Sequence, residues 1–371
     1  MIRLLIVILL VSPPLAGCLE PMIDLDEIPC MVLGQQREGD GTLRILTYDI
    51  AAFSDEMLNQ FTSISGYEVE LIRTTDAGGI LTQLLQTQAA PQADLAIGLD
   101  NTYLQYAIDF CLLQTHSIST EHLDPGALEP YSGPLAVPFD QGDVCLNYDE
   151  IQVDGQNLTV PTTLWNLTEE QWRGRVAFPS PLTSSPGRSF MVATVDYFEH
   201  DEDNNTDAFD WWRAMANNDA IITTGWTEAY ERHYSGGYGE WVEGHIGDAA
   251  MTVSYCHSPG VEAFYGGNWT KSTSLTLPRS SFHQVEYAAV LRGTAEADAA
   301  NAFIEFLISD EVNRNMPQNN LMKSVLSNAT LPETDGYRYH TDLPVHNADV
   351  SMERIGLEME SWLLRWDEAT G

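Results

Sequence analysis

The first part of the chain alternates between two hydrophobic periods. Residues 42–48 and 68–72 alternate apolar and polar positions, and residues 93–98 are mostly apolar. Between them, residues 54–64 and 78–88 place apolar side chains at helical spacing. A period of two predicts strands, and a period of 3.6 predicts helices. Strands that alternate with such helices predict βαβ units and a mostly parallel sheet, whose ligands collect at the carboxyl ends of the strands.

Two later segments predict crossings between lobes. Residues 136–148 predict a long strand that Pro138 and Gly142 interrupt, and residues 285–290 predict a strand that returns the chain to its first lobe. The segments between them predict a second set of strands and helices, and two further helices are predicted at 295–308 and 350–365. We therefore expect an α/β fold of two lobes, hinged at two crossing strands. The expected boundaries are 41–140 with 284–371 for lobe 1, and 141–283 for lobe 2.

The N-terminal segment predicts export. An apolar run over residues 4–11 is far shorter than the roughly 20 residues of a membrane-spanning helix, and it leads into Leu15-Ala16-Gly17-Cys18. This is typical of a signal peptide over residues 1–18 with a lipobox, and lipidation of Cys18 would supply the two acyl chains that stable anchoring needs. An ordinary signal peptide with an incidental cysteine is the alternative. Residues 19–40 lack hydrophobic periodicity and predict a flexible tether.

The amino-acid composition limits the classes of partner that the protein could bind. The formal net charge is −37, and only Lys271 and Lys323 are lysines. Nucleic acid is excluded as a partner, because binding a polyanion requires basic side chains that neutralise phosphates. An acidic surface suits a salt-rich external medium, and general solubility explains it equally well. Four cysteines beyond Cys18 allow three complete disulfide pairings, and their spacing matches no zinc motif.

Two strand ends carry polar side chains that suit a cationic ligand. Tyr48 ends the first predicted strand, and Asp100 follows the buried strand at 93–98. A carboxylate in a cleft of low dielectric pairs with an aminopyrimidine or offsets a cationic ring. The alternative is a strand-end turn, since aspartate and asparagine favour turns for backbone reasons.

A hydroxyl-rich turn and two aromatic residues are the remaining candidate ligand-binding groups. Ser184 and Ser185 precede Pro186 at a predicted helix start, where free N–H groups suit a phosphate or hydroxyl; a plain serine N-cap is the alternative. Trp226 follows a threonine-rich segment, and Tyr255 ends a predicted strand. Aromatic faces attract cations and stack on heteroaromatic rings, although most such residues serve packing.

In order and spacing, these stretches resemble the thiamine-binding substrate-binding proteins of ABC transporters. The segments are Thr47-Tyr48-Asp49, Gly98-Leu99-Asp100-Asn101, residues 181–187, Thr224-Gly225-Trp226 and Ser254-Tyr255. The resemblance implies a two-lobe type II periplasmic-binding fold that closes over thiamine or a thiamine phosphate and delivers it to a membrane permease. On the matching positions, it implies that Tyr48, Asp100, Trp226 and Tyr255 line the ring-binding part. It implies that Ser184 and Ser185 hold the hydroxyl or phosphate end.

Some positions depart from that family. Val261 and Leu321 stand where the family has aromatic residues. Either neighbours such as Tyr265 or Trp269 substitute for them, or the ligand differs.

Two alternatives follow from the same fold. One is a receptor for another solute, such as ferric iron or a polyamine. The other is a thiaminase-like enzyme with Cys145 as the nucleophile, against which stands a structural Cys111–Cys145 disulfide. We expect the receptor: a monomer without enzymatic activity, cofactor or metal, anchored at the outer face of the cell membrane or in the periplasm.

Overall fold

The computed structural model describes residues 30, 33–34, 36–51, 53–201 and 206–371. Cys18, the predicted signal segment and most of the predicted tether lie outside these residues. Within the described part of the chain, no helix is long and apolar enough to cross a membrane.

The first lobe contains the predicted βαβ units. Strand β1 (Thr42–Tyr48) pairs in parallel with β2 (Glu68–Thr74) and with β3 (Leu95–Asp100). Helices α1 (Asp55–Ser65) and α2 (Ala77–Gln86) connect these strands, with Ser54 and Asp76 as their N-caps. Each of these five elements confirms a prediction made from hydrophobic spacing, with boundaries shifted by at most three residues.

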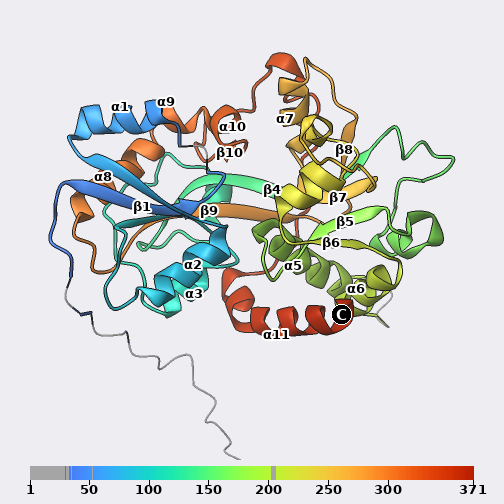
Figure 1. Cartoon of the computed structure of the whole chain (residues 1–371), viewed down its shortest axis with the longest axis horizontal. Helices are drawn as coiled ribbons and strands as arrows, with labels where there is room; N and C mark the ends of the chain where they lie inside the picture. The colour runs from blue at the N-terminus through green and yellow to red at the C-terminus, as the bar shows by residue number, and fades with distance from the viewer. Residues whose placement is uncertain (1–29, 31–32, 35, 52, 202–205) are drawn as a thin grey trace, which may run out of the picture.

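Two long strands join the lobes. Strand β4 (Val137–Asp149) and strand β9 (Phe282–Val290) pair antiparallel along the middle of one sheet, whose order is β2-β1-β3-β9-β4-β7-β5-β6. Figure 1 shows both running from one half of the molecule into the other. Short strands β8 (Ser272–Leu275) and β10 (Lys323–Ser324) also pair with β4.

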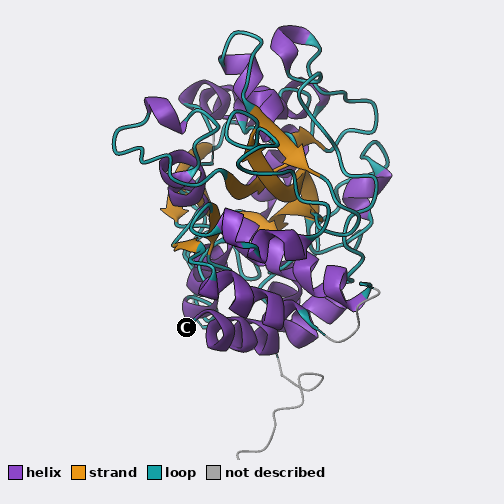
Figure 2. Cartoon of the chain, turned by 90° about the vertical axis from the view of Figure 1, so that its right-hand side faces the viewer, coloured by secondary structure: helices purple, strands orange, loops and turns teal. Residues whose placement is uncertain are grey.

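The second lobe repeats the arrangement. Strand β5 (Val176–Pro179) pairs in parallel with β6 (Ile221–Thr223) and with β7 (Met251–Tyr255). Helix α5 (Ser185–Glu199) is buried on almost all sides, and α6 (Ala208–Asn217) packs against it through Trp211 and Trp212. Seen from the side, the strands lie in the interior and the helices and loops surround them (Figure 2).

The remaining elements are mostly short. They are α3 (Leu104–Asp109), α4 (Pro125–Leu128), a π-helical turn (Glu228–His233), α7 (Ser258–Tyr265), α8 (Ala297–Leu307), α9 (Asp310–Asn313), α10 (Met316–Asn319) and α11 (Met352–Thr370), with 3₁₀ turns at Leu164–Thr168, Glu170–Trp172, Gly239–Trp241 and Thr334–Gly336.

Helix α11 touches both lobes. It packs against α3 on one side and α6 on the other, and its buried residues Ile355, Met359, Trp362 and Trp366 join the hydrophobic core of the second lobe. Figure 1 shows it lying along the lower edge of the molecule beneath both halves. The assignment of residues 284–371 to lobe 1 stays a prediction, as do the other domain boundaries, and α11 contributes side chains to the core of the second lobe.

The cysteines pair differently from our expectation. Cys30 bonds to Cys111, and Cys145 bonds to Cys256. The expected Cys111–Cys145 bridge is therefore wrong. The reason lies in the topology: Cys111 follows α3 in the first lobe, whereas β4 carries Cys145 into the second lobe, beside β7, where Cys145 faces Ser254 in register.

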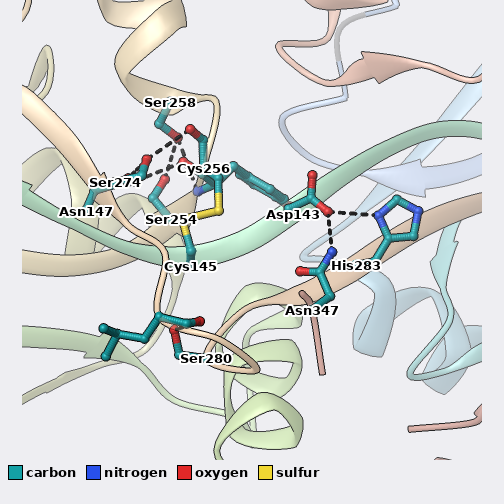
Figure 3. The surroundings of a disulfide bond; sticks show 12 residues. Asp143, Cys145, Asn147, Ser254, Cys256, Ser258, Ser274, Ser280, His283 and Asn347 are labelled. Atoms are coloured by element: carbon teal, nitrogen blue, oxygen red, sulfur yellow. Dashed lines mark hydrogen bonds and ion pairs between the residues drawn. A yellow bond between two sulfur atoms is a disulfide. The ribbon is translucent and has the colours of Figure 1, made fainter. Parts of the chain in front are cut away.

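A charged cluster lies on the crossing strands, next to the Cys145–Cys256 disulfide (Figure 3). The carboxylate of Asp143 on β4 lies 3.0 Å from Nδ1 of His283 on β9, and it accepts from Lys323 at 2.7 Å and from Asn347 at 2.9 Å. Although burial raises the pKa of Asp143, the hydrogen bond with His283 and the charge of Lys323 hold it well below its usual range. The cluster thus ties β4, β9, β10 and the segment before α11 together.

Candidate functional site

A cleft of about 1800 Å³ lies between the lobes. Its walls come from the ends of β1 and β9 and from α2 on one side, and from the loops that follow β5, β6 and β7 on the other. Of the six ligand-binding residues expected from sequence, five line it: Tyr48, Ser184, Ser185, Trp226 and Tyr255. Asp100 does not line the cleft.

Tyr48 is the last residue of β1, and its ring lies against Gly98 in β3. A Cβ atom at Gly98, whose φ is +107°, would come within 2.4 Å of that ring, so this approach needs glycine. The hydroxyl of Tyr48 donates to the Glu286 carboxylate at 3.0 Å and accepts from the Asn320 side-chain amide at 3.1 Å. Burial raises the pKa of Tyr48, so the ring presents a neutral face and a fixed O–H group.

Glu286 on β9 forms a carboxyl pair with Asp140 on β4. The two residues face each other in register, and Asn320 donates to Asp140 at 2.7 Å. Burial raises the pKa of Asp140 to about 7, and burial together with the neighbouring carboxylates raises the pKa of Glu286 well above its ordinary value. Two adjacent carboxyl groups resist ionising together, and a cation beside them favours the ionised form. Since Glu286 lines the cleft, this pair suits a positively charged ligand.

Asp100 ends β3, as the sequence predicted, but it is fully buried. Its carboxylate accepts from the backbone N–H of Thr102 at 2.7 Å, from the side-chain amide of Gln284 at 2.9 Å and from the hydroxyl of Ser185. Burial raises its pKa to about 6. Asp100 therefore lies behind Ser185, and the carboxyl group that faces the cleft is Glu286.

Ser184 and Ser185 begin α5 at the floor of the cleft. Ser184 is the N-cap, and its hydroxyl accepts from the backbone N–H of Gly187. A Cβ atom at Gly187 would lie 2.2 Å from the carbonyl oxygen of Pro179, so only glycine lets the helix start this close to the end of β5. The capping role considered from sequence is thus present, and both serines also line the cleft.

Trp226 lies in the loop after β6 and is held on two sides. Its ring stacks on Tyr230 with centroids 4.8 Å apart and an interplanar angle of 13°. Its indole N–H donates to the hydroxyl of Ser254 at 2.9 Å. Tyr230 lies in the π-helical turn, a form frequent at functional sites, and its hydroxyl donates to the buried carboxyl group of Glu262. These contacts fix the orientation of the indole at the cleft wall.

Tyr255 ends β7 and completes the aromatic part of the site. Its hydroxyl donates to the side-chain oxygen of Gln284 at 3.0 Å, and its backbone N–H donates to the hydroxyl of Ser258 at 3.2 Å. Gln284 also donates to Asp100 and to Ser185. One glutamine of the crossing strand β9 therefore connects residues from both lobes.

Three further residues of the cleft lining bear on its charge and were not singled out as ligand-binding from sequence. They are Glu286, Asp76 and Arg188. Gln284 and Glu286 are two positions apart in β9 and so share one face. The strand predicted from sequence began at residue 285 and therefore did not show this pairing. Arg188 lies near the start of a predicted helix, and nothing in the sequence distinguishes it from an exposed arginine.

The two positions at which this sequence lacks the family's aromatic residues lie in the cleft lining. Val261 and Leu321 both line it, and so does Tyr265, whose hydroxyl donates to the carbonyl oxygen of Gln318 at 3.2 Å. Trp269 is not part of the lining. Of the two proposed substitutes for the missing rings, Tyr265 alone borders the cleft.

Among the described residues, no group of three or more His, Cys, Asp or Glu side chains could hold a metal ion. His257 is buried beside Tyr255, and its Nε2 lies 2.7 Å from the carbonyl oxygen of Leu321. Burial lowers the pKa of His257 to about 4, so it stays neutral at physiological pH. Cys145 is fully buried and disulfide-bonded, and it offers no thiolate for nucleophilic attack in this state.

Comparison with known proteins agrees with this architecture. A protein 25% identical over 334 residues is the thiamine-binding periplasmic protein of Escherichia coli strain K12; the match covers 88% of this chain and 93% of that protein. Among solved structures, a periplasmic thiamin binding protein superposes with a TM-score of 0.74 at 22% identity, covering 91% of this chain and 100% of that one. Iron-bound HitA from Pseudomonas aeruginosa superposes with a TM-score of 0.65 at 18% identity, covering 88% and 99%.

These superpositions confirm the expected two-lobe periplasmic-binding fold. The relatives are binding proteins rather than enzymes. A family model described as bacterial extracellular solute-binding protein matches residues 56–337, which is more than half of the sequence. The chain therefore belongs to the family of bacterial extracellular solute-binding proteins, the exported receptors that serve ABC transporters.

Proposed function

We propose that this protein binds thiamine or a thiamine phosphate outside the cytoplasm and delivers it to an ABC-transporter permease. The observation that carries the proposal is the meeting of a buried carboxyl pair with neutral aromatic rings in one cleft. Glu286 and Asp140 supply the negative charge, and Tyr48, Trp226 and Tyr255 supply the rings. The names of the relatives support the same ligand.

The chemistry of thiamine fits these groups. Its thiazolium ring is a permanent cation, and its aminopyrimidine is a flat heteroaromatic ring with hydrogen-bonding edges. A cation over an aromatic face gains about 0.5–2 kcal/mol, more when water is excluded. Glu286 lies next to the Tyr48 ring and offsets the positive charge, while the indole of Trp226 offers a face for stacking. Ser184 and Ser185 are the proposed contacts of the hydroxyl or phosphate end.

The proposed location of the protein is the outer face of the cell membrane. Export through the signal segment, cleavage before Cys18 and lipidation of Cys18 as the new N-terminus would hold the receptor at the outer face of the cell membrane. The receptor acts as a monomer and catalyses no reaction. The disulfide at Cys145 supports a receptor over a thiaminase-like enzyme.

The test is a calorimetric and tryptophan-fluorescence titration of the purified protein. The ligands are thiamine, its monophosphate and diphosphate, ferric iron, putrescine and spermidine. We expect saturable binding of a thiamine compound alone, with quenching of Trp226 by the stacked ring. Trp226→Ala should remove most of the quenching and weaken binding by about tenfold.

Trp269→Ala is the matched control, because Trp269 is exposed and outside the cleft lining. It should leave affinity and quenching almost unchanged. Tight binding of iron or a polyamine with no response to any thiamine compound would contradict the proposed function.

A further inference from the structure

A loop over residues 236–247 borders the cleft on the side of Trp226. The ring of Tyr238 in this loop lies 5.4 Å from the ring of Tyr230, which in turn stacks on Trp226. The loop residues that line the cleft are Tyr238, Val242, Glu243, Gly244 and His245. The loop therefore extends the aromatic side of the site toward the solvent.

The base of this loop is fixed to the π-helical turn at Glu228–His233. The hydroxyl of Tyr238 donates to the carboxylate of Glu231 at 2.8 Å, and Nδ1 of His245 lies 2.8 Å from the carbonyl oxygen of Glu231. The backbone N–H of Ile246 donates to the carbonyl oxygen of Arg232 at 2.7 Å. The base of the loop thus belongs to the same set of contacts that positions Trp226.

The tip of the loop, Trp241-Val242-Glu243, lacks such support. Trp241 is 70% exposed and Val242 is 39% exposed, and among the described residues their backbone N–H groups donate only to carbonyl groups of the loop itself. Gly237 and Gly244 lie on either side of the tip with φ of +66° and +86°, a region in which glycine alone is unstrained. A segment with few buried apolar contacts moves at low cost in free energy.

The tip carries the groups that suit the solvent side of a cationic ring. An indole face attracts a cation and stacks on a heteroaromatic ring. Glu243 lines the cleft from the second lobe and adds a carboxylate to that of Glu286 on the acidic side. Val261 and Leu321, which also line the cleft, offer no aromatic face. Trp241 is the residue nearest in sequence to this lining that would supply one.

We propose that residues 236–247 form a lid that closes over the bound ligand, with Trp241 stacking on the ligand's ring from the solvent side. The inference rests on the proposed function and adds a contact residue for the organic cation. Closure excludes water from the ring, which strengthens its attraction to Glu243. Because the lid closes after the ligand has entered, it slows release of the ligand more than capture.

The first test is stopped-flow fluorescence with thiamine on wild type and Trp241→Ala, which measures association and dissociation separately. We expect dissociation to accelerate about tenfold in the variant and association to change less than about twofold. Trp241 lies outside the hydrophobic core, so the fold should be kept, and thermal melting verifies this. Trp269→Ala is the matched control, because Trp269 is 57% exposed and its neighbours in sequence do not line the cleft. It should leave both rates unchanged.

The second test measures the exposure of the indole itself. Acrylamide quenches exposed tryptophans, and the difference in quenching between wild type and Trp241→Ala isolates the contribution of Trp241. Saturating thiamine should reduce this contribution by roughly half or more, because a stacked indole is covered by the ligand. The contribution of Trp269, obtained by the same subtraction with Trp269→Ala, should not change.

The possible failures are distinguishable. Unchanged dissociation in Trp241→Ala, or equal exposure of Trp241 with and without ligand, overturns the lid while the proposed function stands. Equal acceleration of dissociation in Trp241→Ala and Trp269→Ala also overturns it. Absence of binding to any thiamine compound overturns the proposed function, and the lid with it.

Discussion

One wall of the cleft carries charge, and the other carries rings. The acidic wall consists of Tyr48 and Glu286, which line the cleft, and Asp140 pairs with Glu286 on the crossing strands. Both carboxyl groups have raised pKa values. The aromatic wall, made of Trp226, Tyr230 and Tyr255, is neutral and held by stacking, hydroxyl contacts and a nearby disulfide. The acidic wall should respond to pH and to the charge of the ligand, whereas the aromatic wall should respond to changes in its support.

The largest expected effect comes from the disulfide behind the aromatic wall. Replacing Cys145 and Cys256 together by serine should lower the free energy of unfolding by about 2–4 kcal/mol, because the bond closes a loop of 111 residues. Ligand affinity should also fall, since Cys256 directly follows Tyr255. Chemical denaturation and calorimetry measure the two quantities.

The other disulfide is a natural control for this prediction. Cys30 and Cys111 close a loop of 81 residues far from the cleft lining. Their replacement by serine should lower stability by a similar amount and leave affinity unchanged. Equal loss of affinity in both double variants would show that the Cys145–Cys256 bond does not support the aromatic wall specifically.

Removing charge from the acidic wall should have the next largest effect. Glu286→Gln keeps the shape of the side chain and removes the carboxylate that faces the cleft, so affinity for a cation should fall about 30- to 100-fold by calorimetry. Glu311→Gln removes the same charge from an exposed site and should change affinity by less than twofold. A Glu286→Gln variant with wild-type affinity would refute the role of the carboxyl pair.

Acidification should weaken cation binding by about tenfold between pH 8 and pH 6, because the pKa of Asp140 is about 7 and a bound cation needs the pair ionised. Proton release on binding, measured by calorimetry in two buffers, should accompany it. Glu286→Gln should flatten this dependence. A profile that is flat for wild type would show that the carboxyl pair does not change its protonation on binding in this range.

The same pKa shift has the opposite effect on the empty protein. A carboxyl group with a raised pKa contributes stability that is fully present below its unfolded value near 4 and is lost as the pH rises through about 7. The ligand-free protein should therefore lose this contribution between about pH 4 and pH 7, and thermal melts with and without ligand should diverge across that range.

The smallest expected effect concerns the support of Trp226. Tyr230→Leu removes the ring that stacks on the indole and should weaken binding about three- to fivefold. Tyr230→Phe keeps the ring and loses only the bond to Glu262, so it should bind more tightly than the leucine variant. Equal affinity of the two variants would assign the effect to Glu262 instead of stacking.

The long elements could be predicted from sequence, because eleven to nineteen residues give several repeats of a hydrophobic period. Helix α8 and strand β4 are examples, and both appear within two residues of their expected ends. Strands β6 and β10, with three and two residues, offer no period to detect. They form because neighbouring strands supply their partners.

The candidate site was predictable only in part. Strand ends and a helix start located Tyr48, Ser184 and Ser185, which line the cleft. The burial of Asp100 behind Ser185 depends on how the lobes meet, and the disulfide partners depend on which strands are neighbours. Neither fact can be derived from the spacing of residues along the sequence. The ligand contacts themselves remain predictions.

The ion pair between Lys323 and Asp143 makes the amine reactivity of Lys323 a reporter of the crossing strands. The sequence has only two lysines, and the side chain of Lys323 is 17% exposed. An amine-selective tag has few lysine targets, and a bonded ammonium group that must leave its carboxylate before reacting is acylated slowly. Mass-spectrometric footprinting at this one position would thus follow movement between the lobes without any engineered probe.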